Sequence, residues 1–220
     1  MLKIVFCDNI FALEGRIMKV KEMITFTEHM DKYFHQECER VIDGVFENNK
    51  LHIDILIYEP NNDFPFWKLV TMGFSDYKMP HFKSSLPNRN EYMIFFNKDV
   101  DVSPTSKELG FYIDALMNTA MASYELKEPV SYAHDIKFEM PDSEMVATIV
   151  MMPEVVPDVG ILRCKLGAFK KCACLQVMPI TQIEYELVYE KSGFWLIDNR
   201  FYNNEDMSKC HYLAEKYRTF

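Results

Sequence analysis

Glycine is scarce and scattered in this sequence: seven glycines occur in 220 residues, and they stand singly. A glycine-rich loop of the kind that cradles phosphate groups is therefore missing. Long apolar runs are missing too, because the stretch 145–152 falls far short of the roughly 20 residues that a membrane-spanning helix needs. The N-terminus lacks the long apolar segment and the small-residue cleavage site of a secretory signal, so we expect a cytoplasmic protein.

Basic residues are outnumbered as well. Lys and Arg total 24 and Asp and Glu total 33, so the formal net charge is −9. A chain this acidic is a poor candidate for direct nucleic-acid binding, which depends on basic patches. The sign suits a basic protein partner, whose approach it would steer, although an acidic balance also serves simply to keep a protein in solution.

The material of a packed core is abundant. Hydrophobic residues make up 49% of the chain, aromatic residues 14% and charged residues 26%, which excludes a disordered or low-complexity protein. The length predicts one domain with embellished ends. The six cysteines follow no secretion signal, so we expect reduced, mostly buried thiols rather than disulfides.

Hydrophobic periodicity predicts both strands and helices. Apolar runs and alternations predict strands over residues 52–58, 67–72, 91–96, 145–152, 159–163 and 171–177. A long amphipathic helix is expected between an N-cap at Ser103 and Tyr124. A capping box over residues 181–184 predicts a short helix with Ile183, Leu187 and Val188 facing inward.

The two ends of the chain are less regular. Thr27 begins a helical apolar stripe, whose end at residues 41–46 equally fits a strand, and a terminal helix is expected over residues 207–220. The elements lack a strict βαβ rhythm. They favour an α+β fold in which helices flank a mixed, largely antiparallel central sheet.

The candidate chemical groups do not form a recognisable catalytic or metal site. Cys172 and Cys174 would face the same side of a strand, but structural zinc needs a second pair of ligands, and core packing is favoured. His134 and Asp135 would face opposite sides, so a turn histidine is favoured over an acid–base pair. We predict no enzyme, no cofactor and no metal. The alternatives are a small enzyme that uses these residues and a structural subunit that assembles with itself.

The block from Pro65 to Asp76, with the sequence PFWKLVTMGFSD, resembles the suppressor-of-fused domain family. That family shows an aromatic pair ahead of a strand and then Thr/Ser-x-Gly-x-Ser-Asp. Further blocks similar to the family follow in order, at residues 52–60, 90–94, 103–124, 150–153 and 175–184, so the resemblance spans about residues 51–198. The fold-signature residues are Trp67, Thr71, Gly73, Ser75 and Asp76.

We expect these signature residues to act in folding rather than in catalysis. Trp67 is expected to fill the core, because large aromatic side chains dominate burial. Gly73 suits a strand end with positive φ or a close approach. Ser75 and Asp76 suit a turn in which their side chains accept backbone N–H bonds.

The resemblance implies a single suppressor-of-fused-like domain over residues 1–220, with a core at about 41–200 and extensions at 1–40 and 201–220. In animals such a domain is similar to a binding module that sequesters a transcription factor. Similar single-domain bacterial chains are immunity proteins, antitoxin-like members of polymorphic toxin systems. The length leaves no room for the second domain of the animal protein, so the resemblance implies a non-catalytic protein that neutralises a basic toxin, often a nuclease.

Contacts with such a partner are expected where polar residues look exposed. The candidates are Ser75, Asp76, Tyr77, Glu139, Asp142 and Glu144.

Overall fold

One mixed sheet organises the chain in the computed structural model, which describes residues 18–48, 51–80, 85–140, 142–202 and 212–218. Eight strands form the sheet in the order β1-β2-β3-β4-β8-β6-β5, with β7 pairing against the beginning of β8. They are β1 (Arg40–Asn48), β2 (Leu51–Tyr58), β3 (Phe66–Met72), β4 (Asn90–Asn97), β5 (Asp135–Lys137), β6 (Met145–Met151), β7 (Arg163–Lys165) and β8 (Lys171–Thr181). Among these described strands, β4 and β8 form the one parallel pair. The predicted α+β fold with a largely antiparallel sheet is confirmed.

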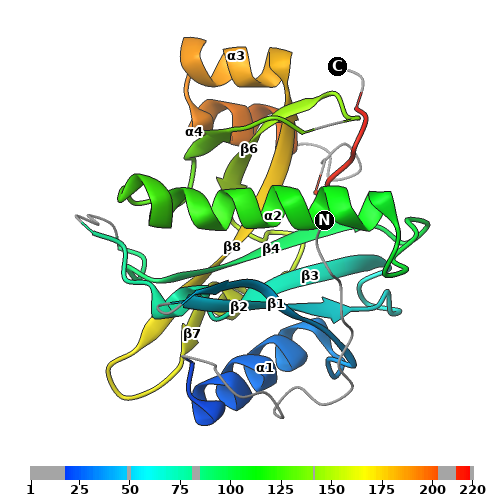
Figure 1. Cartoon of the computed structure of the whole chain (residues 1–220). Coiled ribbons are helices and arrows are strands. Elements are labelled where there is room, and N and C mark those ends of the chain that lie inside the picture. The colour runs from blue at the N-terminus through cyan, green and yellow to red at the C-terminus, as the bar shows by residue number, and fades with distance from the viewer. Residues whose placement is uncertain (1–17, 49–50, 81–84, 141, 203–211, 219–220) are drawn as a thin grey trace.

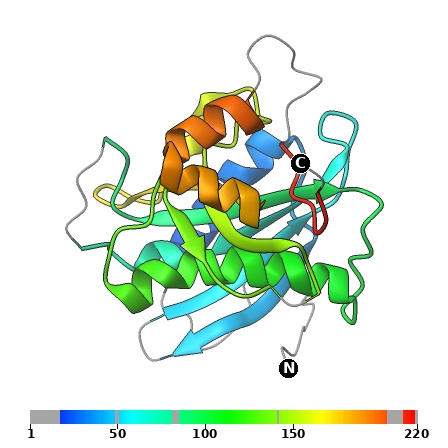
Figure 2. The same ribbon diagram turned by 90° about the horizontal axis from the view of Figure 1, so that it is seen from above.

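Helices cover both faces of this sheet (Figure 1, Figure 2). The two longer ones are α1 (Val20–Phe34) and α2 (Lys107–Leu126), which lie on opposite faces. The shorter α3 (Gln182–Glu190) and α4 (Gly193–Leu196) lie beyond the end of β8, and α4 continues into the π-helical turn η3 (Ile197–Phe201). Short 3₁₀ turns are η1 (Phe74–Asp76) and η2 (Val159–Leu162). None of the described helices is both long and apolar enough to cross a bilayer.

Two hydrophobic cores result, one on each face of the sheet. Phe26 and Phe34 of α1 pack with Phe95 of β4 in one core. Leu109 and Ile113 of α2 belong to the other core, together with the alternate strand residues whose side chains point to that face, such as Ile94 of β4. All eight residues of β2 are buried, because a central strand covered on both faces has no solvent side.

Several boundaries differ from those expected from the sequence. The N-cap of α2 is Ser106, whose hydroxyl accepts from the backbone N–H groups of Glu108 and Leu109, rather than Ser103. Residues 159–162 form η2 and not a strand, because the Asp158 side chain accepts from the N–H of Gly160 and closes a turn. Residues 41–46 belong to a strand, β1.

Strand β8 is longer than expected and continues past Pro179 to Thr181. Its ladder with β4 ends at Gln176, so at Pro179 the strand is paired only with β6. A proline is tolerated there, because one side of the strand needs no ladder donor. At Thr181 the expected capping box forms: its hydroxyl accepts from the N–H of Glu184, whose carboxylate accepts from the N–H of Thr181.

Segments near both ends contribute to the packed structure. Phe26 and Phe34 of α1 are fully buried. Near the other end, the N–H of Ala214 donates to the carbonyl of Phe95 at 2.6 Å, and residues 212–218 are not helical. The rest of the expected helix over 207–220 lies outside the described residues. The proposed core limits at 41 and 200 stay a prediction.

A lysine is buried inside the α1-side core. Lys68 of β3 has no exposed surface, and its Nζ donates to the carbonyls of Glu59 at 2.6 Å, Phe66 at 3.1 Å and Phe64 at 3.4 Å. The ring centroids of Phe34, Phe64 and Phe66 lie 5.5–5.9 Å from Nζ. Burial lowers the pKa of Lys68 to about 8, because a charged amine is poorly solvated there.

The Lys68→Met variant tests this environment through the pH dependence of stability. Between pH 8 and 10.5 the unfolded chain holds more protons at this lysine than the folded chain, so stability rises with pH. Relative to the variant, the wild type is expected to gain at most about 3 kcal/mol across that window. Urea denaturation at a series of pH values measures the difference.

The exposed Lys78 supplies the matched control, because Lys78→Met removes an ordinary surface amine. Its stability curve should run parallel to that of the wild type. If the stability curve of Lys68→Met also ran parallel to that of the wild type, the lowered pKa of Lys68 would be contradicted.

Candidate functional site

The signature block forms a turn that binds a buried carboxylate. Glu91 of β4 is fully buried, and each of its oxygens accepts two hydrogen bonds. Oε1 accepts from the N–H groups of Gly73 at 2.9 Å and Ser75 at 2.8 Å. Oε2 accepts from the hydroxyl of Thr71 at 2.7 Å and the N–H of Phe74 at 3.3 Å. The turn therefore offers donors to Glu91, the reverse of the expectation that Ser75 and Asp76 would accept in it.

Glycine is required at position 73 for two reasons. Its φ is 115°, in the region that side chains rarely adopt, and a Cβ would lie 2.1 Å from the carbonyl oxygen of His52. The glycine thus lets the chain turn against β2 and aim three successive N–H groups at one carboxylate. Burial raises the pKa of Glu91 to about 7, and the hydrogen bonds from Thr71, Ser75 and Gly73 oppose that shift.

Neighbouring residues fix the turn from outside. The Nη1 atom of Arg89 donates to the carbonyls of Ser75 and Asp76, both at 2.7 Å. Lys170 lies between Asp76 and Glu22 of α1, and its ammonium contacts both carboxylates. This bridge joins the signature turn, the β7–β8 hairpin and α1.

Trp67 lies at the edge of the core instead of filling it. Its side chain is half-buried, its Nε1 donates to the carbonyl of Lys98 at 3.1 Å, and Arg40 lies over its ring. The side chains of β3 alternate, so Phe66 and Val70 face α1, whereas Trp67 lies on the α2 side near the beginning of the strand.

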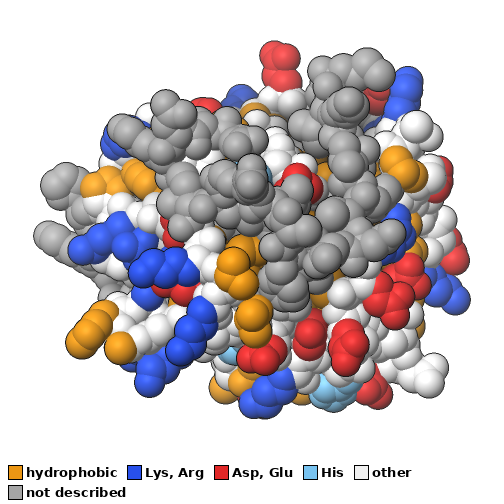
Figure 3. All heavy atoms as spheres, turned by 60° about the horizontal axis from the view of Figure 1, so that its bottom comes forward, with side chains coloured by type: hydrophobic (Ala, Val, Ile, Leu, Met, Phe, Trp, Pro, Cys, Tyr) orange, Lys and Arg blue, Asp and Glu red, His pale blue; other side chains and the backbone are white. Residues whose placement is uncertain are grey.

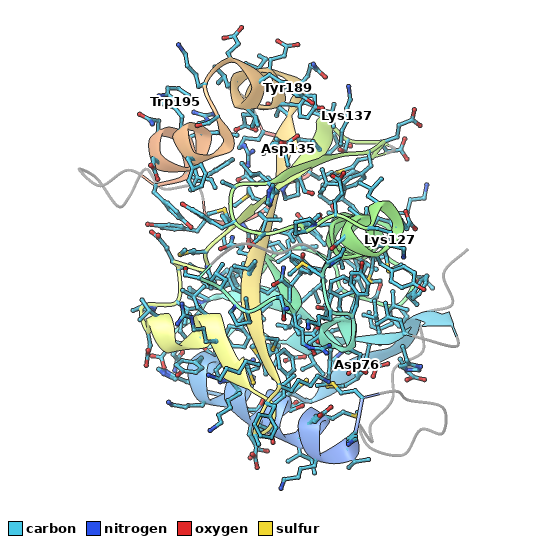
Figure 4. All side chains as sticks on the ribbon, turned by 90° about the vertical axis from the view of Figure 1, so that its left-hand side faces the viewer. Asp76, Lys127, Asp135, Lys137, Tyr189 and Trp195 are labelled. Atoms are coloured by element: carbon cyan, nitrogen blue, oxygen red, sulfur yellow. The ribbon has the colours of Figure 1, made fainter. Side chains whose placement is uncertain are left out.

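The expected partner-binding residues fall into two separate groups. Ser75 is fully buried and Asp76 is mostly buried, so neither presents its side chain to a partner in this structure. Tyr77 is half-buried, with its ring 5.3 Å from that of Tyr124. The acidic members lie in the connection between β5 and β6, where all three are exposed: Glu139, Asp142 and Glu144. Figure 4 shows Asp76 near the end covered by α1 and Asp135 beside α3.

The groups considered for catalysis do not converge in the described part of the chain. His134 is exposed, and its Nδ1 accepts from the N–H of Ser131 at 2.8 Å, as in a turn histidine. Asp135 follows it in the short edge strand β5. Cys172 and Cys174 are fully buried and unoxidised. Burial raises the pKa of the Cys174 thiol, which opposes formation of a reactive thiolate.

One cluster of potential metal ligands is present among the described residues. Atoms of Asp43, His52 and Asp54 all lie within 4.8 Å of one another. His52 Nε2 is 2.9 Å from Asp54 Oδ1 and 3.4 Å from Asp43 Oδ1, and the N–H of Gly44 donates to the same Asp54 oxygen. These contacts lie at the bulge of β1 between Ile42 and Phe46, where they join the bulge to β2. The three side chains thus form a hydrogen-bonded network that joins the bulge of β1 to β2.

Helices α3 and α4 present large apolar side chains to solvent. The side chains are Ile183 (51% exposed), Tyr189 (73%), Phe194 (57%) and Trp195 (39%), and we call them the aromatic face. Ile183 was expected to point inward, but the buried members of the first turns are Glu184 and Tyr185. Figure 4 shows Tyr189 and Trp195 at the same end of the molecule. The same helical segment carries three exposed acidic residues, Glu186, Glu190 and Asp198, and one exposed basic residue, Lys191.

The aromatic face is held rigidly from below. The carboxylate of Glu184 is fully buried and contacts Arg218 at 2.6 Å and Arg200 at 3.3 Å. Gly193 lets the start of α4 lie against the backbone of Ala133, because a Cβ at this position would lie 2.2 Å from the Ala133 carbonyl oxygen. The sequence does place three aromatic residues, Tyr189, Phe194 and Trp195, close to Gly193. The periodicity of the short helix, however, did not show which of its sides is exposed.

Comparison with known proteins identifies the family. The family model for suppressor of fused protein matches residues 49–208, which contain both the signature turn and Glu91. The chain belongs to the suppressor-of-fused family. No protein of curated function matches its sequence significantly.

Solved structures of this family share the fold at low sequence identity. A protein described as a suppressor-of-fused homologue of Neisseria gonorrhoeae FA 1090 has a TM-score of 0.60 at 15% identity, covering 89% of this chain and 94% of that one. Drosophila Suppressor of Fused has a TM-score of 0.58 at 12% identity, and the match covers 88% of this chain but 48% of the fly protein. A chain of the Sufu-Fu complex has a TM-score of 0.56 at 9% identity, covering 80% and 82%. The suppressor-of-fused domain is thus a fold that one relative presents in complex with another protein.

The Glu91→Gln variant tests the carboxylate-binding turn. The amide has one accepting oxygen, so in either orientation its NH₂ group would face two of the four donors. We expect the free energy of unfolding to fall by about 2–4 kcal/mol, because buried donors are left unsatisfied. Chemical denaturation of the purified variant measures this loss.

Two further variants calibrate the result. Thr71→Val removes the hydroxyl that donates to Glu91 and accepts from the N–H of Tyr92, and should lose about 1–3 kcal/mol. Glu125→Gln makes the same carboxylate-to-amide change at an exposed position of α2 and should change stability by less than about 0.5 kcal/mol. Equal stability of Glu91→Gln and Glu125→Gln would overturn the role of the turn.

Proposed function

We propose that this chain is a non-catalytic protein-binding module that acts as an immunity protein, binding and neutralising a cognate toxin of a bacterial polymorphic toxin system. The aromatic face on α3 and α4 is the observation that carries the proposal. Four large apolar side chains in one short segment are exposed there. Large apolar side chains exposed in one segment indicate an interaction site, and tyrosine and tryptophan are frequent anchors in such sites.

The charge around this face favours a basic partner. The exposed acidic residues Glu186, Glu190 and Asp198 outnumber the one exposed basic residue of this segment, Lys191, and the whole chain has a formal net charge of −9. A nuclease toxin must be basic where it meets phosphate groups, so an acidic inhibitor can use the same electrostatic field. Such steering weakens at high salt. The proposal therefore names a nuclease domain as the toxin.

The fold match to a bacterial relative extends over most of both chains and supports a bacterial setting for the proposal. The Neisseria homologue is covered over 94% of its length. The Sufu-Fu complex supplies a family precedent for protein binding, although it names a different partner. The acidic connection containing Glu139, Asp142 and Glu144 is a second candidate contact, because all three side chains are exposed.

Co-expression with the product of the neighbouring gene tests the proposal. We expect a stable complex on co-purification and rescue of growth when that product is toxic. Tyr189→Ala and Trp195→Ala should each weaken the complex by about tenfold or more, since aromatic anchors in a binding face contribute strongly. Leu126→Ala is the matched control, because it removes a large exposed apolar side chain from the end of α2, outside both proposed binding surfaces.

Three outcomes contradict parts of the proposal. Absence of both a complex and rescue would remove the toxin-neutralising role. A complex unaffected by Tyr189→Ala and Trp195→Ala would move the interface away from the aromatic face. A stable homodimer in solution that those two variants dissociate would assign the face to a second copy of this chain, which is the self-assembling alternative.

A further inference from the structure

A positively charged hollow lies beside the β7–β8 hairpin, in contrast to the acidic residues near the aromatic face. Its volume is about 300 Å³, and residues 85–89 form one wall while the hairpin forms the other. Arg89, Arg163 and Lys171 line it, and no acidic residue is among its lining in the described part of the chain. Phe169, between the two strands of the hairpin, is fully exposed beside these cations. We call this site the basic hollow.

Positively charged side chains lie close together around the basic hollow although they repel one another. Lys165 and Lys171 are directly opposite each other in the β7–β8 ladder, and both are exposed. Like charges in that position destabilise a strand pair. Arg163 lies two residues before Lys165, on the same side of β7. The hairpin thus concentrates positive charge in a chain whose formal net charge is −9.

The surface view shows the same segregation. In Figure 3 several blue side chains gather on the left of the face, with orange ones at its edge, whereas red side chains, with some further blue ones, lie toward the lower centre and right. The left side is also where the β7–β8 hairpin projects in Figure 1. Lys170 is not part of the available charge, because it contacts Glu22 and Asp76.

The basic hollow is preorganised by the fold. Arg163 Nη2 donates to the carbonyl of Ser85 at 3.3 Å and joins the hairpin to the opposite wall. Arg89 is held by the carbonyls of Ser75 and Asp76, so the signature turn positions this cation. The N–H of Gly167 donates to the carbonyl of Lys170 and closes the hairpin connection. A binding site whose groups are already in place loses less conformational entropy on association.

We propose that the basic hollow binds a short acidic segment of a partner protein, with carboxylates at Arg163 and Lys171 and an apolar side chain against Phe169. Arginine matches a carboxylate with two parallel hydrogen bonds, and an exposed aromatic ring offers apolar contact area. A nucleic acid is disfavoured, because the hollow has few cations and a polyanion would meet the net negative charge of the whole chain.

This inference goes beyond the proposed toxin binding and does not depend on it. The two surfaces differ in charge and in the elements that form them, so loss of one activity leaves the other measurable. A partner that presents both a basic region and an acidic tail could occupy both surfaces, but each is tested by its own variants.

A binding titration with the full chain tests the basic hollow. The probe is a labelled peptide that alternates glutamate and leucine, and the control peptide replaces glutamate by glutamine. We expect the acidic peptide to bind at low salt, the glutamine peptide to bind at least about tenfold more weakly, and the affinity to fall as salt rises. Oligothymidylate is titrated in the same way.

Matched charge reversals locate the site. Lys171→Glu and Arg163→Glu should each weaken the acidic peptide by about tenfold or more, and Phe169→Ala by several-fold. Lys191→Glu makes the same change on an exposed lysine next to α3 and should have no effect. Melting curves confirm that each variant is folded. If Lys171→Glu does not fold, Lys171→Gln takes its place.

Equal binding of the two peptides, or equal effects of Lys171→Glu and Lys191→Glu, would overturn the proposal. Tighter binding of oligothymidylate than of the acidic peptide, lost in the same variants, would assign the hollow to nucleic acid instead.

Discussion

The buried carboxylate of Glu91 is the interaction on which the centre of this fold depends. A carboxylate without exposed surface is costly unless its lone pairs are satisfied, and here four donors from residues 71–75 satisfy them. Because β4 pairs with both β3 and β8, fixing Glu91 also fixes the point at which the antiparallel part of the sheet meets the parallel pair. Carbonyls of the same turn accept from the Arg89 guanidinium and so position it. Lys170 joins Asp76 of the turn to Glu22 of α1.

A second carboxylate plays a corresponding part at the other end of β8. Glu184 caps its own helix through Thr181 and also contacts Arg200 and Arg218. Residue 218 is distant in sequence, so this contact holds the final described segment against α3. Both buried acids thus accept from backbone N–H groups and from side-chain donors, the hydroxyl of Thr71 for Glu91 and two arginines for Glu184.

The sequence was informative where a local pattern determines structure and less so where partners come from elsewhere. The apolar runs of β2, β3 and β4 and the block from Pro65 to Asp76 sufficed to predict the strands and the family. The role of Glu91 in the turn could not be read locally, because its donors lie 16–20 residues earlier and meet it only when β3 and β4 pair. Exposure of Ile183 was also missed, since the tertiary contacts of Glu184 decide which side of α3 is buried.

Strand β8 separates the two surfaces that we assign to partners. Lys171, at the beginning of the strand, lines the basic hollow, and Thr181, at its end, caps α3 below the aromatic face. An extended strand from residue 171 to 181 spans about 33 Å. That is several times the screening length of about 8 Å at physiological salt, so the acidic and basic regions do not cancel each other. A net charge of −9 therefore describes neither surface, because the two ends of one strand hold acidic and basic side chains too far apart to screen each other.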